Sequence, residues 1–162
     1  MMPMCPCRRR SGFTILEVVI IVVMLGIAVP PTLGILMSSA SSRADTINTS
    51  RATTLAGAVL EAVVADTHSS DPALGFDALA DPDAYLETPT TGLYDRLRPF
   101  TDDYDAVGLT YEVEIGPLVA SDGAVSADSG DNVFRVITVR VRYPASSGAS
   151  YEMPVSVMVT DA

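Results

Sequence analysis

The feature that most constrains this chain is an apolar stretch near its amino terminus, residues 13–37. Fifteen of its residues are Phe, Ile, Leu or Val, and as an α-helix it would be about 37 Å long, enough to cross a hydrocarbon core of roughly 30 Å. It also contains one acidic residue, Glu17. A carboxylate at the bilayer centre costs about 2.5–3.5 kcal/mol, and less toward the end of a span, so insertion stays favourable. The stretch therefore predicts one transmembrane helix with a costly acid near its start.

Three arginines lie shortly before this stretch, Arg8, Arg9 and Arg10. Basic residues next to a membrane span tend to remain on the cytoplasmic side. We therefore expect the amino terminus in the cytoplasm and the chain after Met37 on the other side of the membrane.

Two adjacent prolines, Pro30 and Pro31, lie in the second half of the stretch, with Gly26 and Gly34 close by. Proline has no backbone N–H, so we expect the helix to bend or loosen there. An ordinary membrane anchor with a kink of no functional importance would account for the prolines equally well.

A basic start followed by an apolar segment is also typical of a secretory signal peptide. Small residues in 38–44 offer a cleavage site after Ala40. However, the apolar segment is longer than the roughly 7–15 residues usual in such signals, and it contains an acid and a proline pair. These features argue against a signal peptide without excluding one.

The residues SGFTILE (11–17) resemble the processing site of type IV prepilins and type II secretion pseudopilins. The resemblance covers residues 8–36: a short basic leader, a glycine before the cleaved bond, a phenylalanine after it, and a glutamate as the fifth mature residue. It implies that prepilin peptidase cleaves between Gly12 and Phe13 on the cytoplasmic side and then N-methylates Phe13. The proline doublet departs from the family, where a single proline late in the span is more usual.

The resemblance also implies a role for Glu17. An acid inside a membrane needs a partner, and cleavage would create one, the α-amine of Phe13, on the same chain or on the next subunit. The expected function is then that of a structural subunit, major or minor, of a type IV pilus or type II secretion pseudopilus. Its expected partners are prepilin peptidase, other pilin or pseudopilin subunits and an inner-membrane assembly platform. It would reside in the bacterial inner membrane before entering the filament.

The charge balance excludes some other functions. All ten basic residues are arginine, against 20 acidic residues, and the chain from Phe13 onward has 7 basic and 20 acidic residues. Such an acidic domain repels phosphate backbones, so no nucleic-acid partner is expected. The only cysteines, Cys5 and Cys7, are too few to hold a metal without further ligands.

Residues 38–66 have the spacing of a helix with one buried stripe, and we expect this helix to continue the membrane span. The stripe consists of Ile47, Leu55, Val59, Ala62 and Val63. The helix should end near residues 67–72, with His68 as a cap or an exposed residue. Residues 67–106 contain several prolines and are expected to form loops with single helical turns.

Three segments alternate apolar and polar residues as half-buried strands do: 109–115, 133–143 and 151–160. They predict an antiparallel meander with one apolar face for the helix. On its polar face, Glu112 and Glu114 are expected to meet Arg140 and Arg142. Pro154 cannot donate to a neighbouring strand, so the third strand should lie at the sheet edge or contain a bulge.

The expected fold is therefore α+β and pilin-like, with a long amino-terminal helix packed on a three-stranded antiparallel meander. The expected organisation is a leader (1–12), a transmembrane or filament-core helix (13–37) and a periplasmic globular domain (38–162). That domain would comprise an amphipathic helix (38–66), a loop region (67–106) and a sheet (107–162).

Acidic loops raise the question of a metal site. The loop 117–132 offers four oxygen-bearing side chains, which are weak calcium candidates: Asp122, Asp128, Asp131 and Asn132. Their spacing matches no EF-hand, and an exposed acidic turn explains them more simply. We expect a solvated loop, and no metal site, at the acidic cluster of Asp102, Asp103 and Asp105.

Catalysis is not expected. His68 is the only histidine of the chain, and no Gly-x-Ser-x-Gly or His-Glu-x-x-His pattern is present. The alternative function from the sequence is a periplasmic binding domain that never polymerises, either membrane-anchored or released by signal cleavage, with calcium binding as one option. No cofactor is otherwise expected.

Overall fold

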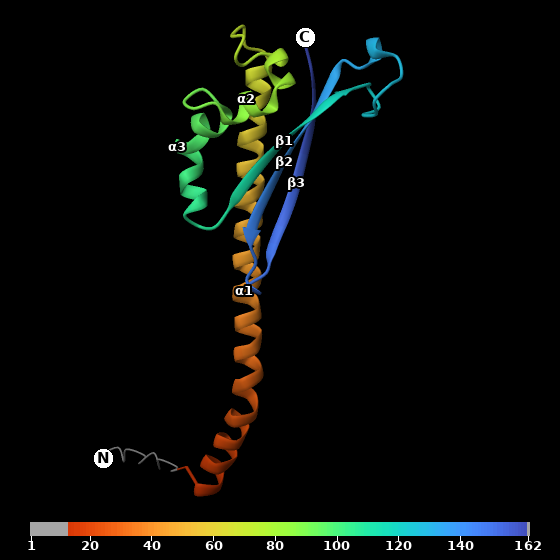
Figure 1. Cartoon of the computed structure of the whole chain (residues 1–162). Coiled ribbons are helices and arrows are strands. Elements are labelled where there is room, and N and C mark those ends of the chain that lie inside the picture. Colours follow the sequence, from red (N-terminus) through yellow and green to blue (C-terminus); the bar gives the residue numbers. More distant parts are fainter. Residues whose placement is uncertain (1–12, 162) are drawn as a thin grey trace, which may run out of the picture. The chain divides into compact units, whose positions relative to one another are not determined.

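Helix α1, Ile15–Thr67, is the longest element of the computed structural model, which describes residues 13–161 (Figure 1). It continues from the apolar stretch into the polar segment without a break, as predicted, and it ends one residue beyond the expected position. The chain divides into two compact units between Ser41 and Ser42. The first unit contains the apolar half of α1, and the second contains the remaining half and all other elements.

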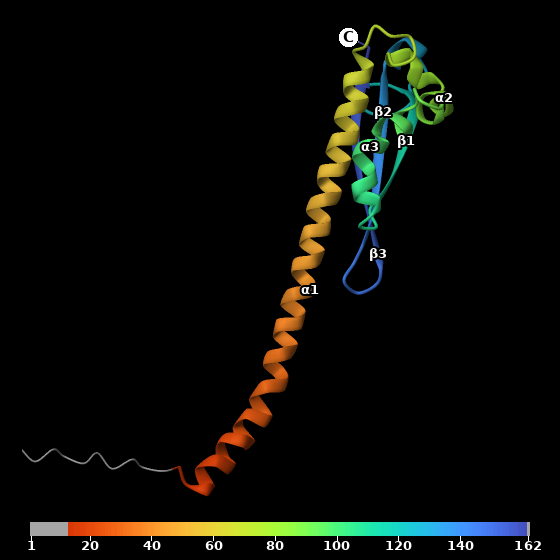
Figure 2. The ribbon, with the colours of Figure 1, turned by 90° about the vertical axis from the view of Figure 1, so that its left-hand side faces the viewer.

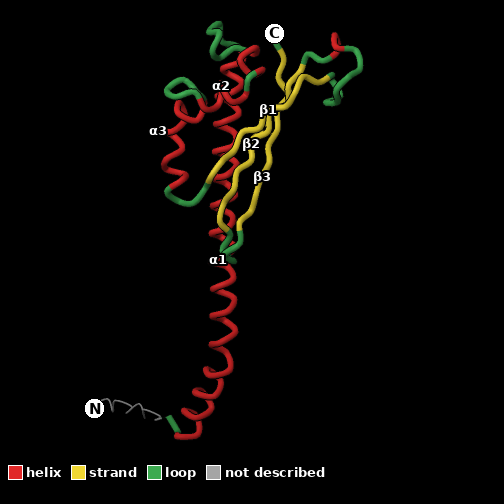
Figure 3. Tube along the Cα trace, in the orientation of Figure 1, coloured by secondary structure: helices red, strands yellow, loops and turns green. Residues whose placement is uncertain are grey.

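The second unit has several short helical segments and three strands, coloured by type in Figure 3. In chain order these elements are η1 (Phe76–Ala80), α2 (Pro82–Glu87), α3 (Leu93–Asp105), β1 (Thr110–Val119), η2 (Ser129–Asp131), β2 (Phe134–Pro144) and β3 (Ser150–Thr160). The architecture is therefore α+β, as the sequence predicts.

The expectation of single helical turns between residues 67 and 106 is wrong for α3, which is 13 residues long. Pro99 lies inside this helix, where proline removes one backbone hydrogen bond. Leu93 is fully buried, and Leu97 and Tyr104 pack against the core. This side-chain stripe, spaced as on a helix face, offsets the loss at Pro99.

The three strands form an antiparallel meander in the order β1-β2-β3, as predicted. β3 pairs with β2 alone, so Pro154 lies in an edge strand, where a missing donor is tolerated. β1 extends to Val119, so the expectation that this strand ends at Ile115 is wrong. A register shift between Ile115 and Leu118 lets it continue. A Cβ atom on Gly116 would lie 3.1 Å from the carbonyl oxygen of Val136, so glycine permits the close approach of β2.

The core lies between one face of the sheet and the second half of α1, which run side by side in Figures 1 and 2. Leu55, Val59 and Val63 of α1 are fully inaccessible to solvent, as predicted for the buried stripe. They belong to the same cluster as the inward-facing residues of β1 and β2, which are Val113, Ile137, Val139 and Val141.

Ile47 is an exception, because its side chain is 53% exposed and the prediction that it belongs to the buried stripe is wrong. At this level α1 meets the turn between β2 and β3 through polar groups. The Asn48 side chain donates to the carbonyl of Pro144 at 2.9 Å, and Asp45 accepts from the backbone N–H of Ser146 at 2.7 Å. Because the side chains of Asp45 and Asn48 face the turn, the side chain of Ile47 lies on a different side of α1 and remains exposed to solvent.

Candidate functional site

The first turn of α1 contains Glu17, the residue that the sequence links to assembly. α1 begins at Ile15, and the backbone N–H of Glu17 donates to the hydroxyl of Thr14 at 3.2 Å. Thr14 is therefore the N-cap residue, and Glu17 occupies the third helical position; this is the residue spacing of a capping box, of which the structure shows the hydrogen bond to the Thr14 hydroxyl. A carboxylate here is also stabilised by the positive end of the helix dipole. Thr-x-x-Glu spacing is the signal from which this cap is predictable, but the sequence analysis missed it.

Glu17 and Phe13 are both exposed, Phe13 by 73%. Among residues 13–161, no ion pair includes Glu17. The predicted leader charges Arg8, Arg9 and Arg10, and the predicted cleavage residue Gly12, lie outside the described residues. The carboxylate is thus accessible to a partner outside the described fold.

The apolar side chains after Glu17 are also uncovered. Every residue from Phe13 to Ala40 is exposed, and α1 contains an apolar window long enough to cross a membrane, none of which is buried. Such a continuous apolar surface is unfavourable in water. A lipid bilayer or neighbouring helices would cover it.

α1 runs through Pro30 and Pro31 without ending. The missing N–H groups would otherwise bond to the carbonyls of Gly26 and Ile27, four residues earlier. The hydroxyl of Thr32 donates to the carbonyl of Val29 at 2.8 Å, so the polar group next to the doublet is satisfied within the helix.

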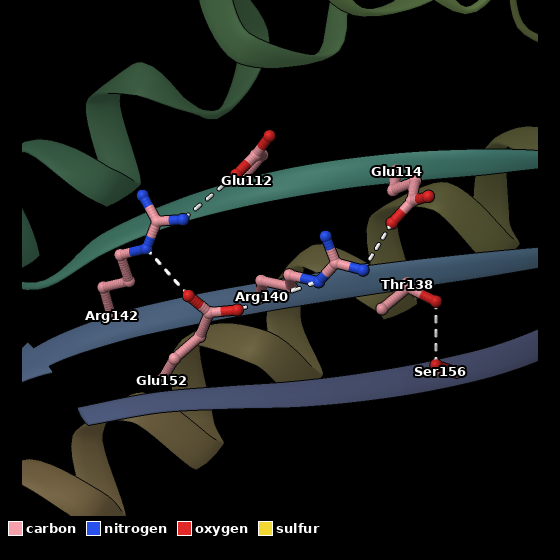
Figure 4. Close-up of polar contacts among 7 residues, drawn as sticks. All are labelled: Glu112, Glu114, Thr138, Arg140, Arg142, Glu152 and Ser156. Atoms are coloured by element: carbon pink, nitrogen blue, oxygen red, sulfur yellow. Dashed lines mark hydrogen bonds and ion pairs between the residues drawn. The ribbon is translucent and has the colours of Figure 1, made fainter.

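The polar face of the sheet carries a network of ion pairs (Figure 4). Glu114 contacts Arg140 at 2.7 Å, and Glu112 lies 3.7 Å from Arg142, so the predicted pairing is confirmed. Glu152 of β3, which the prediction did not include, lies 2.9 Å from Arg142 and 3.8 Å from Arg140. Glu152 raises the pKa of Arg142 by accepting its hydrogen bond. Exposed pairs of this kind contribute little to stability, but they favour one strand register.

The four calcium candidates lie in the loop between β1 and β2, where most of their polar groups take part in local turns. Asp122 accepts from the N–H of Ala124 at 2.9 Å, and Asp128 accepts from that of Gly130 at 2.9 Å. Asn132 bonds to the backbone of Ser126 through both side-chain polar atoms, and Asp131 accepts from the Ser126 hydroxyl. In the described part of the chain, no group of three or more His, Cys, Asp or Glu residues is arranged to hold a metal ion.

A buried polar cluster joins α1 to α2 and α3, and the sequence analysis missed it. Asp66, near the end of α1, is only 8% exposed and accepts two hydrogen bonds from the guanidinium of Arg96. The phenol of Tyr85 donates to the same carboxylate at 2.5 Å. Asp66 and Arg96 are 30 residues apart in the sequence, so no local pattern indicates that they meet.

Burial and the neighbouring carboxylate shift the ionisation of this cluster. Burial, more than the hydrogen bond to Asp66, raises the pKa of Tyr85 well above its ordinary value. The hydrogen bonds to Asp66 raise the pKa of Arg96. Elsewhere in the core, burial raises the pKa of Tyr111 to about 12. His68, by contrast, is exposed, and its Nδ1 lies 2.8 Å from the carbonyl of Val64 at the end of α1, as expected for a residue at a helix end.

In comparisons with known proteins, no protein-family profile, no curated protein sequence and no solved structure matches this chain.

Replacing Asp66 by Asn should destabilise the second unit by about 2–4 kcal/mol, because Arg96 would keep its charge in a partly buried position without a counter-ion. Urea unfolding of the detergent-solubilised protein, followed by near-ultraviolet circular dichroism, measures this loss. Glu114→Gln is the matched control on the polar sheet face, and it should cost less than about 1 kcal/mol. Equal losses for the two variants would contradict the structural importance of the buried cluster.

The stability of the protein should decrease at alkaline pH. Because the folded state raises the pKa of Tyr85, the unfolded chain releases this proton first, at about pH 10. The stabilisation is complete below that pH and declines above it by about 1.4 kcal/mol per pH unit for each such tyrosine. Tyr85→Phe should reduce this slope in urea unfolding between pH 9 and pH 11 (roughly the range set by the ordinary tyrosine pKa). Tyr151→Phe, at an exposed position, should leave it unchanged.

Proposed function

We propose that this protein is a structural subunit, major or minor, of a type IV pilus or a type II secretion pseudopilus. In this proposal prepilin peptidase cleaves between Gly12 and Phe13 and methylates the new amino terminus. The chain then waits in the bacterial inner membrane, with its second unit in the periplasm, until an assembly platform adds it to a filament. The pilin-like resemblance of residues 8–36 and the α+β architecture both support this function.

The observation that carries the proposal is the solvent exposure of the first half of α1, together with its unpaired acid. Its apolar side chains are exposed on all sides, and its single acid lies in the first turn without an ion-pair partner among the described residues. A helix of this kind suits two environments in succession, first lipid and then a bundle of identical helices. Exchange between them replaces one apolar contact by another, so the net free-energy change is small.

Glu17 would provide the specificity that apolar contacts lack. In a medium of low dielectric constant, an unpaired charge is unfavourable, and a nearby opposite charge removes much of that penalty. The α-amine of Phe13 exists only after cleavage. A subunit would therefore dock at the axial position where its charge meets the opposite charge of a neighbour, and an uncleaved chain would lack one of the two groups.

A non-polymerising membrane-anchored or signal-cleaved periplasmic domain is the rival function. A single apolar helix near the amino terminus is compatible with it, because a simple membrane anchor or a signal sequence can also be an apolar helix in this position. The two functions predict different mature amino termini.

Mass spectrometry of the protein purified from the membrane of its native host should find N-methylated Phe13 at the amino terminus. The peptide should begin at this residue, and deletion of the host's prepilin peptidase should restore the leader. A mature chain that begins at Ser41, or one that retains Met1, would instead support the rival function.

Substitution of Glu17 by Ala should leave membrane insertion intact but lower incorporation into filaments by at least about tenfold, because one charge would remain unpaired in an apolar environment. Glu17→Gln should be similarly impaired, since glutamine keeps the capping geometry but lacks the charge. Thr14→Ala is the matched variant, which keeps the charge and removes only the cap, at a cost of about 1 kcal/mol.

Carbonate extraction measures insertion in these variants, and immunoblotting of sheared filaments measures incorporation. Normal incorporation of the Glu17→Gln variant would refute the electrostatic role. A defect in Thr14→Ala as large as that in Glu17→Gln would show that capping, rather than charge pairing, is the function of this turn.

A further inference from the structure

The arginines of the described chain fall into two groups. Of the seven between residues 13 and 161, five bond to an acceptor of the same chain: Arg96, Arg98, Arg135, Arg140 and Arg142. The remaining two, Arg43 and Arg51, form no ion pair or side-chain hydrogen bond with any residue of that range. Both are exposed on α1. In a domain with so many carboxylates, two unpaired cations mark a surface suited to an acidic partner.

An apolar side chain lies between these two cations. Arg43, Ile47 and Arg51 follow one another at intervals of four residues, so they lie on one side of α1. Ile47 is 53% exposed and does not belong to the core cluster. The stripe thus combines charge with apolar area, which is more typical of a protein contact than of a simply solvated helix face.

Arg51 also borders a groove between α1 and α3, with a volume of about 420 Å³. Its other lining residues are Pro99, Phe100, Asp103, Tyr104 and Val107. Phe100 is 41% exposed and Val107 is 42% exposed, while the rings of Phe100 and Tyr104 contact each other with centroids 5.3 Å apart. We call the stripe and this groove together the arginine groove.

The loop between β1 and β2, residues 120–133, has the complementary composition. Val125 is 67% exposed at its surface, and Asp122 and Asp128 lie three residues to either side of it. Each of these aspartates uses only its Oδ1 atom in the loop turns. Within residues 13–161 the Oδ2 atoms accept no hydrogen bond and are accessible to a guanidinium group.

The loop cannot fill the arginine groove of its own chain. α3 ends just before β1 begins, and the loop begins where β1 ends, so the ten residues of β1 separate them. At about 3.3 Å per residue this distance is roughly 33 Å. Figure 1 shows α3 and this loop at different ends of β1. A groove and its complement at separate places on one chain fit together only between copies, and such a contact repeats from copy to copy.

We infer that the arginine groove binds the β1–β2 loop of a second copy of this chain, with Val125 against Phe100 and Val107 and the loop carboxylates near Arg43 and Arg51. This head-to-tail contact would bring the second units of neighbouring subunits into register. It rests on the proposed filament function for its biological setting, although the contact itself is measurable without filaments.

Disulfide cross-linking in membranes tests this contact. Two tagged full-length chains are co-expressed, both with Cys5→Ser and Cys7→Ser, one with Val107→Cys and the other with Val125→Cys. Oxidation should give a mixed dimer several-fold more abundant than that from the control pair, Ala65→Cys with Val125→Cys, because Ala65 lies on an exposed face of α1 away from the groove.

Charge reversal identifies the cause of the cross-link. Arg51→Glu in the first chain should reduce the mixed dimer several-fold, whereas Arg98→Glu, an equal change of charge on α3 outside the groove, should not. Asp122→Arg with Asp128→Arg in the second chain should restore the dimer formed with Arg51→Glu.

A dimer no more abundant than the control, or one insensitive to Arg51→Glu, would overturn the inference. A second result would also overturn the inference, namely that Arg43→Glu and Arg51→Glu weaken retention on phosphatidylglycerol vesicles and leave the cross-link unchanged. That result would assign the stripe to lipid headgroups. Filaments that contain N-methylated Phe13 but lack the cross-link would disprove this contact alone. A cross-link in a chain that is neither cleaved nor polymerised would leave the contact standing and disprove the filament function.

Discussion

The packing of α1 against the inner face of the sheet is the interaction on which the second unit depends. A sheet of three strands needs an apolar partner to be stable, and Leu55, Val59 and Val63 provide it, each worth about 1.5–3 kcal/mol when fully buried. Polar contacts hold the helix at both ends of this stripe, through Asn48 at one end and Asp66 at the other. Apolar burial thus supplies most of the stabilisation, and these hydrogen bonds determine where along the sheet the helix lies.

In the first half of α1 the apolar residues are distributed differently. There the apolar residues surround the whole helix, and no residue from Phe13 to Ala40 is buried. The stripe in the second half is one-sided because a sheet covers only one side, whereas an all-round apolar surface requires an all-round apolar environment. The one acid in this half occupies the helix turn in which a negative charge is best tolerated. Its position therefore suits the isolated helix as well as the ion pair proposed for the filament.

Sequence patterns predicted the elements governed by repetition. The long helix, the strand alternation, the meander and the pairing of Glu112 and Glu114 with arginines all follow from periodic burial.

The predictions from sequence patterns were wrong or incomplete where a single tertiary contact determines the structure. The full length of α3 was not predicted because Pro99 within it is usually a sign that a helix ends. The extension of β1 was not predicted because the strand continues past Gly116 only through a register shift. The cluster of Asp66, Tyr85 and Arg96 joins residues too distant in the chain for any local signal. Glu17 was predicted to act in assembly because of its apolar surroundings, and that role stays a prediction, while its hydrogen bond to Thr14 was not anticipated.

The hydroxyl of Thr14 that accepts from Glu17 has one consequence for maturation. If the bond before Phe13 is hydrolysed as proposed, the threonine remains on the product, separated from the new end by one residue. Release of the leader would then leave this hydrogen bond intact. The mature chain would therefore keep the N-cap of its first turn and gain a free α-amine one residue before it, so the new positive charge would lie next to a helix start that is already capped.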